Sequence, residues 1–305
     1  MTNICEPCVC TTVHQLTENS EYHILEIEFY LLKEGHEDPY THGADAQKVA
    51  GNWYFHKAPT RAGAAASESN SSRAPTAAGG YRGGTRKGLD LTFGGPPDSG
   101  AVGGILLRSL RRVSPDGKLI SGPSLLVDEL LAQSDKANIA ALVASWGTLR
   151  AFPGTAEGPR MVVESRKDAQ LPVYSTPRIG LDLYKAQSPP AADDPRVVFV
   201  ARPYRYIVQP DILTANGRMQ TFVGLYEGLL HDTNPQRALS KACDLSGLKT
   251  KTGEDYAQSY RTGRKSGKVV KFVGAKTSNP KAYIEMVGAL RPFLTPASDV
   301  SAADG

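Results

Sequence analysis

The chain has 305 residues, 40% of them hydrophobic, and its 35 Lys and Arg against 31 Asp and Glu give a formal net charge of +4. This length and apolar content allow a sizeable core, which excludes a fully disordered chain. The sequence has no run of about 18 uncharged apolar residues and no secretory signal at its start, so we expect an intracellular protein without a membrane anchor.

The start of the chain is polar and holds three of the four cysteines, Cys5, Cys8 and Cys10. A structural zinc ion needs four ligands, and only His14 and the remote Cys243 could complete such a set. We therefore expect reduced thiols, no metal and a disordered tail over residues 1–20.

A β-rich domain is predicted over residues 21–209. Aromatic and β-branched residues from Tyr22 to Leu32 predict a strand that carries Glu26 and Glu28 on one face. Residues 59–79 are mostly Ala, Ser, Gly and Thr and read as a disordered insertion in a hairpin. A glycine-rich basic loop leads into a strand ending near Gly94, and an amphipathic helix begins near Ser121. Further strands are predicted at residues 52–57, 103–110, 161–164, 174–183 and 197–200.

The periodicity becomes helical after residue 210, with helices predicted at residues 219–230, 235–245, 255–264 and 280–293. We read residues 210–296 as a helical basic extension and residues 297–305 as a second disordered tail. The fold class is therefore α+β: a mainly antiparallel core, either a partly open barrel or a curved sheet, with flanking helices and the helical extension.

The extension is locally basic. Residues 241–281 contain ten Lys and Arg against only Asp244, Glu254 and Asp255. Such an excess can hold several phosphates if the residues share a face, and it can equally be a solvated helical surface. A second contact with DNA and a docking surface for a partner protein both remain open for this extension.

One group of residues in the first strand and the loop after it suggests chemistry. Glu28 lies two residues before Tyr30, and His42 follows a dozen residues later, which would suit a general base beside an aromatic platform. Packing or a salt bridge on a half-buried strand explains the same pattern. The loop with Arg82, Arg86 and Lys87 among glycines suits a phosphate contact, although glycine-rich loops also serve as plain turns.

Five segments in order, within about residues 22–207, resemble the alkyladenine DNA glycosylases. They are Leu-Glu-Ile-Glu-Phe-Tyr-Leu at 25–31, Asp-Pro-Tyr-Thr-His at 38–42, Gly-Ile-Leu-Leu-Arg-Ser-Leu at 104–110, Leu-Ile-Ser-Gly-Pro-Ser-Leu at 119–125, and Pro-Arg-Ile-Gly at 177–180 with Pro-Arg-Val-Val-Phe-Val at 195–200. The resemblance implies the family's fold, which is like the C-terminal domain of formyltransferases.

The resemblance also implies a monofunctional glycosylase that flips a damaged or modified purine out of double-stranded DNA and needs no cofactor. Glu28 would activate water, while Tyr30 and His42 would hold the flipped base. Arg108 matches an arginine near the nucleotide backbone, or it is a structural arginine paired with Glu26 or Asp128. The location would be nuclear in a eukaryote and cytoplasmic or nucleoid in a bacterium.

The sequence departs from the family in the hairpin that fills the gap left by the flipped base. Where the family has Tyr-Val-Tyr, this chain has Trp-Tyr-Phe-His at 53–56. Tyr54 and Tyr81 are the candidate wedges, and Tyr54 also a candidate base contact. Asp90 stands in place of an asparagine and as a carboxylate would only accept hydrogen bonds, which would change the set of bases accepted.

The altered hairpin keeps a second hypothesis open: a non-catalytic nucleic-acid-binding module with the same fold. A third hypothesis is hydrolysis of a free nucleoside or nucleotide.

Overall fold

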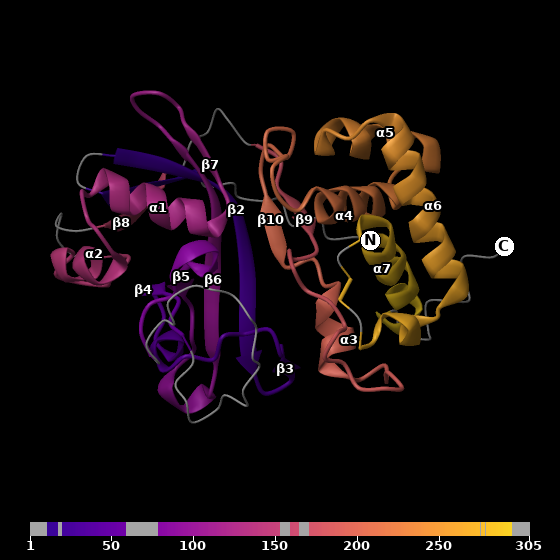
Figure 1. Ribbon diagram of the computed structural model, residues 1–305, viewed down its shortest axis with the longest axis horizontal. Coiled ribbons are helices and arrows are strands. Elements are labelled where there is room, and N and C mark those ends of the chain that lie inside the picture. The colour runs from indigo at the N-terminus through magenta and orange to yellow at the C-terminus, as the bar shows by residue number, and fades with distance from the viewer. Residues whose placement is uncertain are drawn as a thin grey trace. The chain divides into compact units, whose positions relative to one another are not determined.

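The computed structural model describes residues 11–17, 20–58, 79–152, 159–164, 171–274, 276–277 and 279–294. The chain divides into two compact units, which Figure 1 shows in ribbon form. Unit 1 comprises residues 1–31 and 42–170, and unit 2 comprises residues 32–41 and 171–305. The insertion predicted at residues 59–79, except Gly79, and the C-terminal tail predicted at 297–305 lie outside the described residues, as do Cys5, Cys8 and Cys10.

Unit 1 is built on an antiparallel sheet that is not closed into a barrel, which confirms the predicted α+β class. The strand order is β4 (Trp53–Phe55), β5 (Leu89–Thr92), β6 (Val102–Arg112), β2 (Ser20–Lys33), β1 (Thr11–Thr17) and β8 (Arg160–Glu164), with β7 (Leu119–Ser121) beside β6. Short 3₁₀ turns lie at Asp45–Lys48, Gly84–Arg86 and Pro97–Ser99.

Strand β1 corrects the tail predicted over residues 1–20. Residues 11–17 pair antiparallel with β2 on one side and with β8 on the other, with Val13 opposite both His23 and Val162. Backbone hydrogen bonds to two neighbouring strands order this segment, and a prediction from local composition cannot see those partners because they lie elsewhere in the chain.

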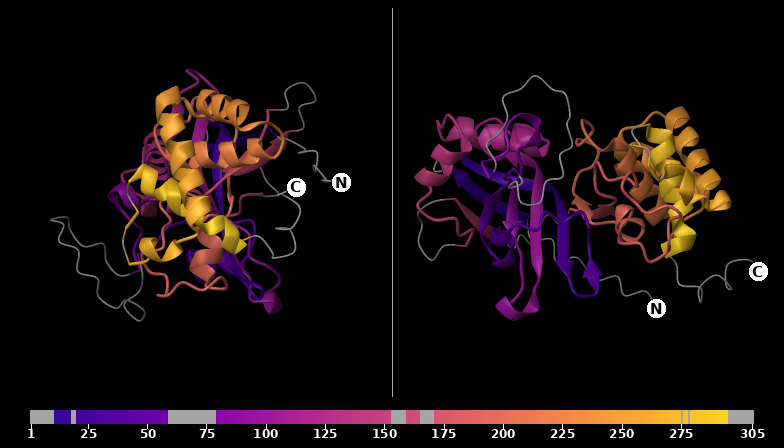
Figure 2. Two further views of the ribbon diagram at one scale, coloured as in Figure 1. Left: turned by 90° about the vertical axis from the view of Figure 1, so that its right-hand side faces the viewer. Right: turned by 60° about the horizontal axis from the view of Figure 1, so that its bottom comes forward.

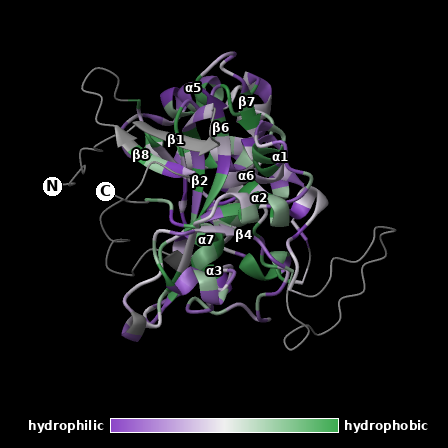
Figure 3. Ribbon diagram, turned by 90° about the vertical axis from the view of Figure 1, so that its left-hand side faces the viewer, coloured by the Kyte–Doolittle hydropathy of each residue, from purple (hydrophilic) through white to green (hydrophobic). Residues whose placement is uncertain are grey.

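Helices α1 (Pro123–Gln133) and α2 (Ile139–Ser145) cover one face of this sheet (Figure 1). Pro123 at the first helical position starts α1, and the Asn138 side chain caps α2 by accepting from the Ala141 amide at 2.9 Å. Figure 3 shows β2 banded with hydrophobic and hydrophilic residues, as expected of a strand with two different faces. The shared core lies between helices and sheet and includes Trp53, Phe55, Leu89, Leu107, Leu126 and Leu142.

Unit 2 is mainly helical. Its strands are β3 (His36–Glu37), which pairs with the end of β2, and β9 (Tyr174–Thr176), which pairs antiparallel with β10 (Arg205–Ile207). Helices α4 to α7 pack against one another in every view of Figures 1 and 2. Their bounds, close to those predicted, are Arg218–Leu230, Pro235–Ser246, Thr250–Ser266 and Pro280–Leu294, with a 3₁₀ turn at Val269–Phe272.

Two segments of unit 2 differ from the prediction. Residues 197–200, expected as a strand, belong to helix α3 (Pro195–Val200), because Asp194 caps the helix by accepting from the Arg196 amide at 2.8 Å. The strand expected at residues 174–183 ends at Thr176, directly before a proline, and proline cannot donate to a strand ladder.

The boundary between the compact units also differs from the predicted one at residues 209–210. It lies between Gln170 and Leu171, because Leu183, Val197 and Val200 share one buried core with helices α4 to α7. Arg178 is fully buried in this unit and donates to both carboxylate oxygens of Asp38, at 2.5 and 3.2 Å. Residues that looked like the end of the β-rich domain therefore belong to the helical unit.

Helices α6 and α7 pack unusually closely. A Cβ atom added at Gly263 would stand 2.0 Å from the carbonyl oxygen of Glu285, and one added at Gly288 would stand 2.2 Å from that of Tyr260. Both positions require glycine, because backbone atoms cannot move aside as a flexible side chain can. Within the described ranges, none of the helices combines the length and hydropathy needed to cross a bilayer.

Candidate active site

The strand register of unit 1 sorts polar and apolar side chains onto opposite faces of the sheet. Tyr54 on β4 lies opposite Asp90 on β5, which lies opposite Leu106 on β6. Residues directly opposite in an antiparallel pair share a face, and so do residues two apart along a strand, which adds Arg108 to this row. The intervening residues, such as Leu89 and Leu107, enter the core beneath α1 and α2.

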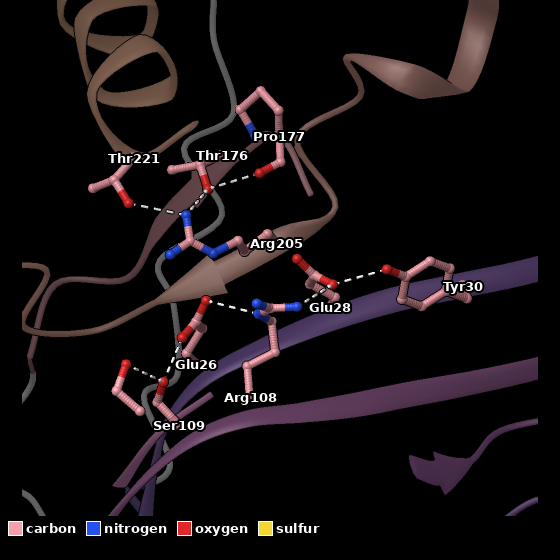
Figure 4. Close-up of polar contacts among 10 residues, drawn as sticks. Glu26, Glu28, Tyr30, Arg108, Ser109, Thr176, Pro177, Arg205 and Thr221 are labelled. Atoms are coloured by element: carbon pink, nitrogen blue, oxygen red, sulfur yellow. Dashed lines mark hydrogen bonds and ion pairs between the residues drawn. The ribbon is translucent and has the colours of Figure 1, made fainter. Parts of the chain in front are cut away.

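Glu26 and Glu28 lie two residues apart on β2 and both reach Arg108 on β6 (Figure 4). The Arg108 Nη1 atom donates to Glu28 Oε2 at 3.2 Å, and Nε donates to Glu26 Oε1 at 3.1 Å. The Tyr30 hydroxyl also donates to Glu28 Oε2, at 2.8 Å, and the Ser109 hydroxyl donates to Glu26. The predicted strand thus brings Glu28 and Tyr30 together, and Arg108 pairs with Glu26, as in the alternative reading of Arg108 as a structural arginine.

This cluster lies inside the protein: the exposed fractions of Glu26 and Glu28 are 2% and 0%. Burial alone would lower the pKa of Arg108, but the Glu28 and Glu26 carboxylates outweigh it and raise that pKa above its ordinary value. The guanidinium therefore stays charged, and with the Tyr30 hydroxyl it fixes the orientation of the Glu28 carboxylate.

A second group gathers around His42, next to the 3₁₀ turn at Asp45–Lys48 that precedes β4. The His42 and His56 rings stack with their centroids 5.1 Å apart, and the Tyr54 ring lies 6.0 Å from each of them. His56 Nε2 lies 2.8 Å from Asp90 Oδ1, while Gln47 Nε2 donates to Asp90 Oδ2 at 2.8 Å. We call these five residues, His42, Gln47, Tyr54, His56 and Asp90, the histidine cluster.

Burial lowers the pKa of His42 to about 4, and the nearby His56 and Arg82 act in the same direction, against an opposing effect of Asp90. His42 is therefore a neutral imidazole at neutral pH. Burial also raises the pKa of Tyr54, so its hydroxyl stays protonated. His42 and Tyr54 therefore offer uncharged aromatic faces with hydrogen-bonding edges, which suits the stacking of a planar heterocycle.

Two glycines make room for the histidine cluster. A Cβ atom at Gly88 would stand 2.7 Å from the Nδ1 atom of His56. One at Gly104 would stand 2.5 Å from both Asp90 Oδ2 and Gln47 Nε2. Any side chain at either position would displace the polar contacts between these residues.

The basic loop contributes less to a surface than the sequence suggested. Arg82 donates through Nε to the Lys57 carbonyl at 3.1 Å, and Lys87 pairs with Asp128 of α1 at 2.5 Å. Arg86 is exposed. The Tyr81 ring packs edge-on against Phe55, with centroids 6.3 Å apart, so Tyr81 belongs to the rim of the core.

Asp90 and Arg108, predicted as DNA contacts, instead touch protein groups and are buried, with exposed fractions of 2% and 8%. Asp90 orients His56, and Arg108 orients the two glutamates. From the sequence, Gln47 had no predicted role, and His56 was a catalytic candidate only on the condition that the insertion folds away from it. No local signal marks them, because each acquires its partner only when the fold brings Asp90, more than thirty positions away, next to it.

Metal binding receives no support from the part of the chain that the structure describes, where no group of three or more His, Cys, Asp and Glu side chains is placed to hold an ion. Cys243, considered as a remote zinc ligand, is buried in the helical core of unit 2.

By its fold and its candidate site, the chain is an α+β protein with an open antiparallel sheet, two buried glutamates and a histidine cluster. No protein-family model matches the chain. Among curated proteins it is similar to "Uncharacterized protein L759" of Acanthamoeba polyphaga mimivirus, with 30% identity over 203 residues, 63% of this chain and 79% of the viral protein. The chain belongs to the same family as that viral protein.

Proposed function

We propose that the protein is a monofunctional DNA glycosylase that hydrolyses the N-glycosidic bond of a damaged or modified purine. The observation that carries this proposal is Glu28: a buried carboxylate, oriented by Arg108 and Tyr30, on the sheet that also bears the histidine cluster. The ordered resemblance of five segments to the alkyladenine DNA glycosylases supports the same assignment.

In this mechanism the target nucleotide leaves the duplex, at a cost of about a few kcal/mol, and its base stacks against Tyr54 and neutral His42. A neutral imidazole is the better partner here, because it does not repel a purine that carries positive charge from alkylation or protonation.

Glu28 then accepts a proton from water as the water oxygen bonds to the anomeric carbon and the bond to the purine nitrogen breaks. The electron pair of that bond leaves with the base, which departs neutral if it carried positive charge and otherwise takes up a proton from solvent. The Glu28 carboxylate also stabilises the positive charge that develops on the sugar, and Arg108 and Tyr30 keep it in place.

The direct test compares the purified protein with Glu28→Gln on duplexes containing hypoxanthine, an etheno-adduct of adenine or a methylated purine, with free-base release as the readout. We expect release by the wild type and a loss of about 10²- to 10⁴-fold in the variant, with duplex binding kept. Glu26→Gln is the matched control, because Glu26 shares Arg108, whereas the Tyr30 hydroxyl donates to Glu28. Equal rates for wild type and Glu28→Gln would refute the assignment.

A second candidate is a nucleic-acid-binding module without excision chemistry. The observation that favours it is the full burial of Glu28 in an ion pair with Arg108, since a salt bridge alone explains such an arrangement. Salt-sensitive duplex binding without release of any of the tested bases would select this candidate.

A further inference from the structure

The basic residues of the C-terminal helices are not evenly spread. From Arg261 to Gly274 the chain has five Lys and Arg residues and no Asp or Glu. In the preceding stretch, Lys249 and Lys251 are followed by Glu254 and Asp255, and Asp255 pairs with Lys281 at 2.9 Å. The positive excess is therefore concentrated at the C-terminal end of α6 and just after it.

Four of these residues form one exposed strip. Arg261, Arg264 and Lys265 are spaced i, i+3 and i+4 on α6, so they are surface neighbours, and Lys268 follows directly after the C-cap Gly267. Lys271, the fifth, is held by Glu285. Among the described carboxylates, none forms an ion pair with the four residues, which we call the basic strip.

The helix dipole explains only part of this arrangement. Arg264 and Lys265 lie in the last turn of α6, where cations offset the negative end of a helix by about 0.3–1 kcal/mol each. Arg261 lies before that turn and Lys268 lies beyond the helix. Keeping four exposed cations together costs repulsion that a bound polyanion would remove.

The basic strip borders a cavity of about 570 Å³ within unit 2, because Arg264 belongs to the strip and also lines the cavity. Glu227 also lines this cavity, but its carboxylate accepts hydrogen bonds from Arg291 and from the Tyr260 hydroxyl. Because the charges of Glu227 and Arg291 offset each other, Arg264 gives the cavity wall a net positive charge, which favours an anionic group there.

We infer that the basic strip is a binding surface for the phosphodiester backbone of nucleic acid, separate from the candidate active site. Three to four phosphates match its four cations, since each strand of a duplex presents a phosphate about every 3.4 Å along the axis. The choice of nucleic acid over another polyanion rests on the proposed function. The contact itself needs no excision chemistry and no lesion.

The test uses the full chain and a lesion-free duplex, with affinity measured between about 50 and 200 mM salt. One variant replaces Arg261, Arg264, Lys265 and Lys268 by Gln, a good helix former. The matched control replaces the equally exposed Arg237, Lys241, Lys249 and Lys251 by Gln, and so removes the same charge. Thermal unfolding and circular dichroism confirm that both variants fold.

We expect the strip variant to bind at least tenfold more weakly at about 50 mM salt and to lose about 3 to 4 from the slope of log affinity against log salt. The control variant should lose much less. Equal losses of affinity in both variants would show that only net charge matters, and this would overturn the inference. Unchanged binding by the strip variant would overturn it as well. Loss of binding to anionic lipid vesicles but not to DNA would also overturn it.

The two proposals fail separately. If no tested base is released but duplex binding depends on the strip, the glycosylase assignment fails and the strip stands. If Glu28-dependent release occurs and duplex binding ignores the strip, the strip inference fails and the glycosylase assignment stands.

Discussion

Each unit contains a group of arginine, glutamate and tyrosine side chains, and the two groups are arranged differently. In unit 2, two nitrogens of Arg291 donate hydrogen bonds to the carboxylate of Glu227, which also accepts one from the Tyr260 hydroxyl. In unit 1, Arg108 divides its nitrogens between Glu26 and Glu28. A two-point pair fixes a carboxylate more firmly than a single hydrogen bond does. The first arrangement is suited to holding helices together, whereas the second holds two buried carboxylates beside one cation.

The largest expected difference is between the losses of unfolding free energy caused by Arg108→Gln and by Arg291→Gln. Arg108→Gln leaves two carboxylates buried without their cation and should destabilise unit 1 by about 3–5 kcal/mol. Arg291→Gln should cost only about 1–2 kcal/mol, because its side chain and that of Glu227 are partly exposed, at 23% and 13%. Hydrogen exchange resolved by peptide would assign each loss to its unit. Equal costs would mean that the two pairs play the same role.

Glycine substitutions sharpen the comparison at a smaller scale. Gly263→Ala should destabilise unit 2 by about 2–3 kcal/mol, because the new methyl group meets backbone atoms of α7. Gly228→Ala on α4 is its control: a Cβ there meets nothing within 4 Å, so replacing a helical glycine should stabilise by about 0.5–1 kcal/mol. Chemical denaturation measures both changes.

Gly88→Ala in unit 1 should act on function more than on stability. The added methyl group pushes against the His56 ring, a side chain that can rotate away, and so breaks its contact with Asp90. We expect base release to fall at least about tenfold while the unfolding free energy falls by about 1 kcal/mol. Loss of the folded state in Gly88→Ala, with wild-type base release by the fraction that stays folded, would contradict this prediction.

The remaining expected difference between the units concerns the pH dependence of their stability. The pKa of His42 in the folded protein is about 4, below its ordinary value of 6.5. As the pH falls through this range, the unfolded chain binds the proton first, so the stability present above pH 6.5 is lost progressively toward pH 4. His42→Gln should flatten the stability curve there, and an unchanged slope would show that His42 is not the group responsible.

The stability of unit 2 should instead fall at alkaline pH. Burial, and then Glu227, raise the pKa of Tyr260 above its ordinary value of 10.0. This contribution is complete below pH 10 and is lost as the pH rises through the higher folded value, because the unfolded chain releases its proton first. Tyr260→Phe should remove that alkaline loss, which denaturation followed between pH 9 and 11 would detect (roughly one unit either side of the unperturbed value).

Much of the fold could be read from local pattern. Helices α4 to α7 have long apolar periodicities bounded by turn residues, and each formed within five residues of its expected bounds. Two local expectations were wrong for opposite reasons. Residues 11–17 form a strand because of partners remote in sequence, whereas residues 197–200 form a helix because Asp194 and Pro195 outweigh their β-branched side chains.

The sequence by itself determined that Glu26 and Glu28 share one face of a strand, with Tyr30 beside them, because side chains along a strand alternate with a period of two. Only the tertiary structure decided that both glutamates meet Arg108, that His56 meets Asp90, and that residues 171–209 join the helical unit. The physical reason is the same in each case: strand register and core packing unite residues distant in sequence, and no local pattern specifies which distant residues will meet.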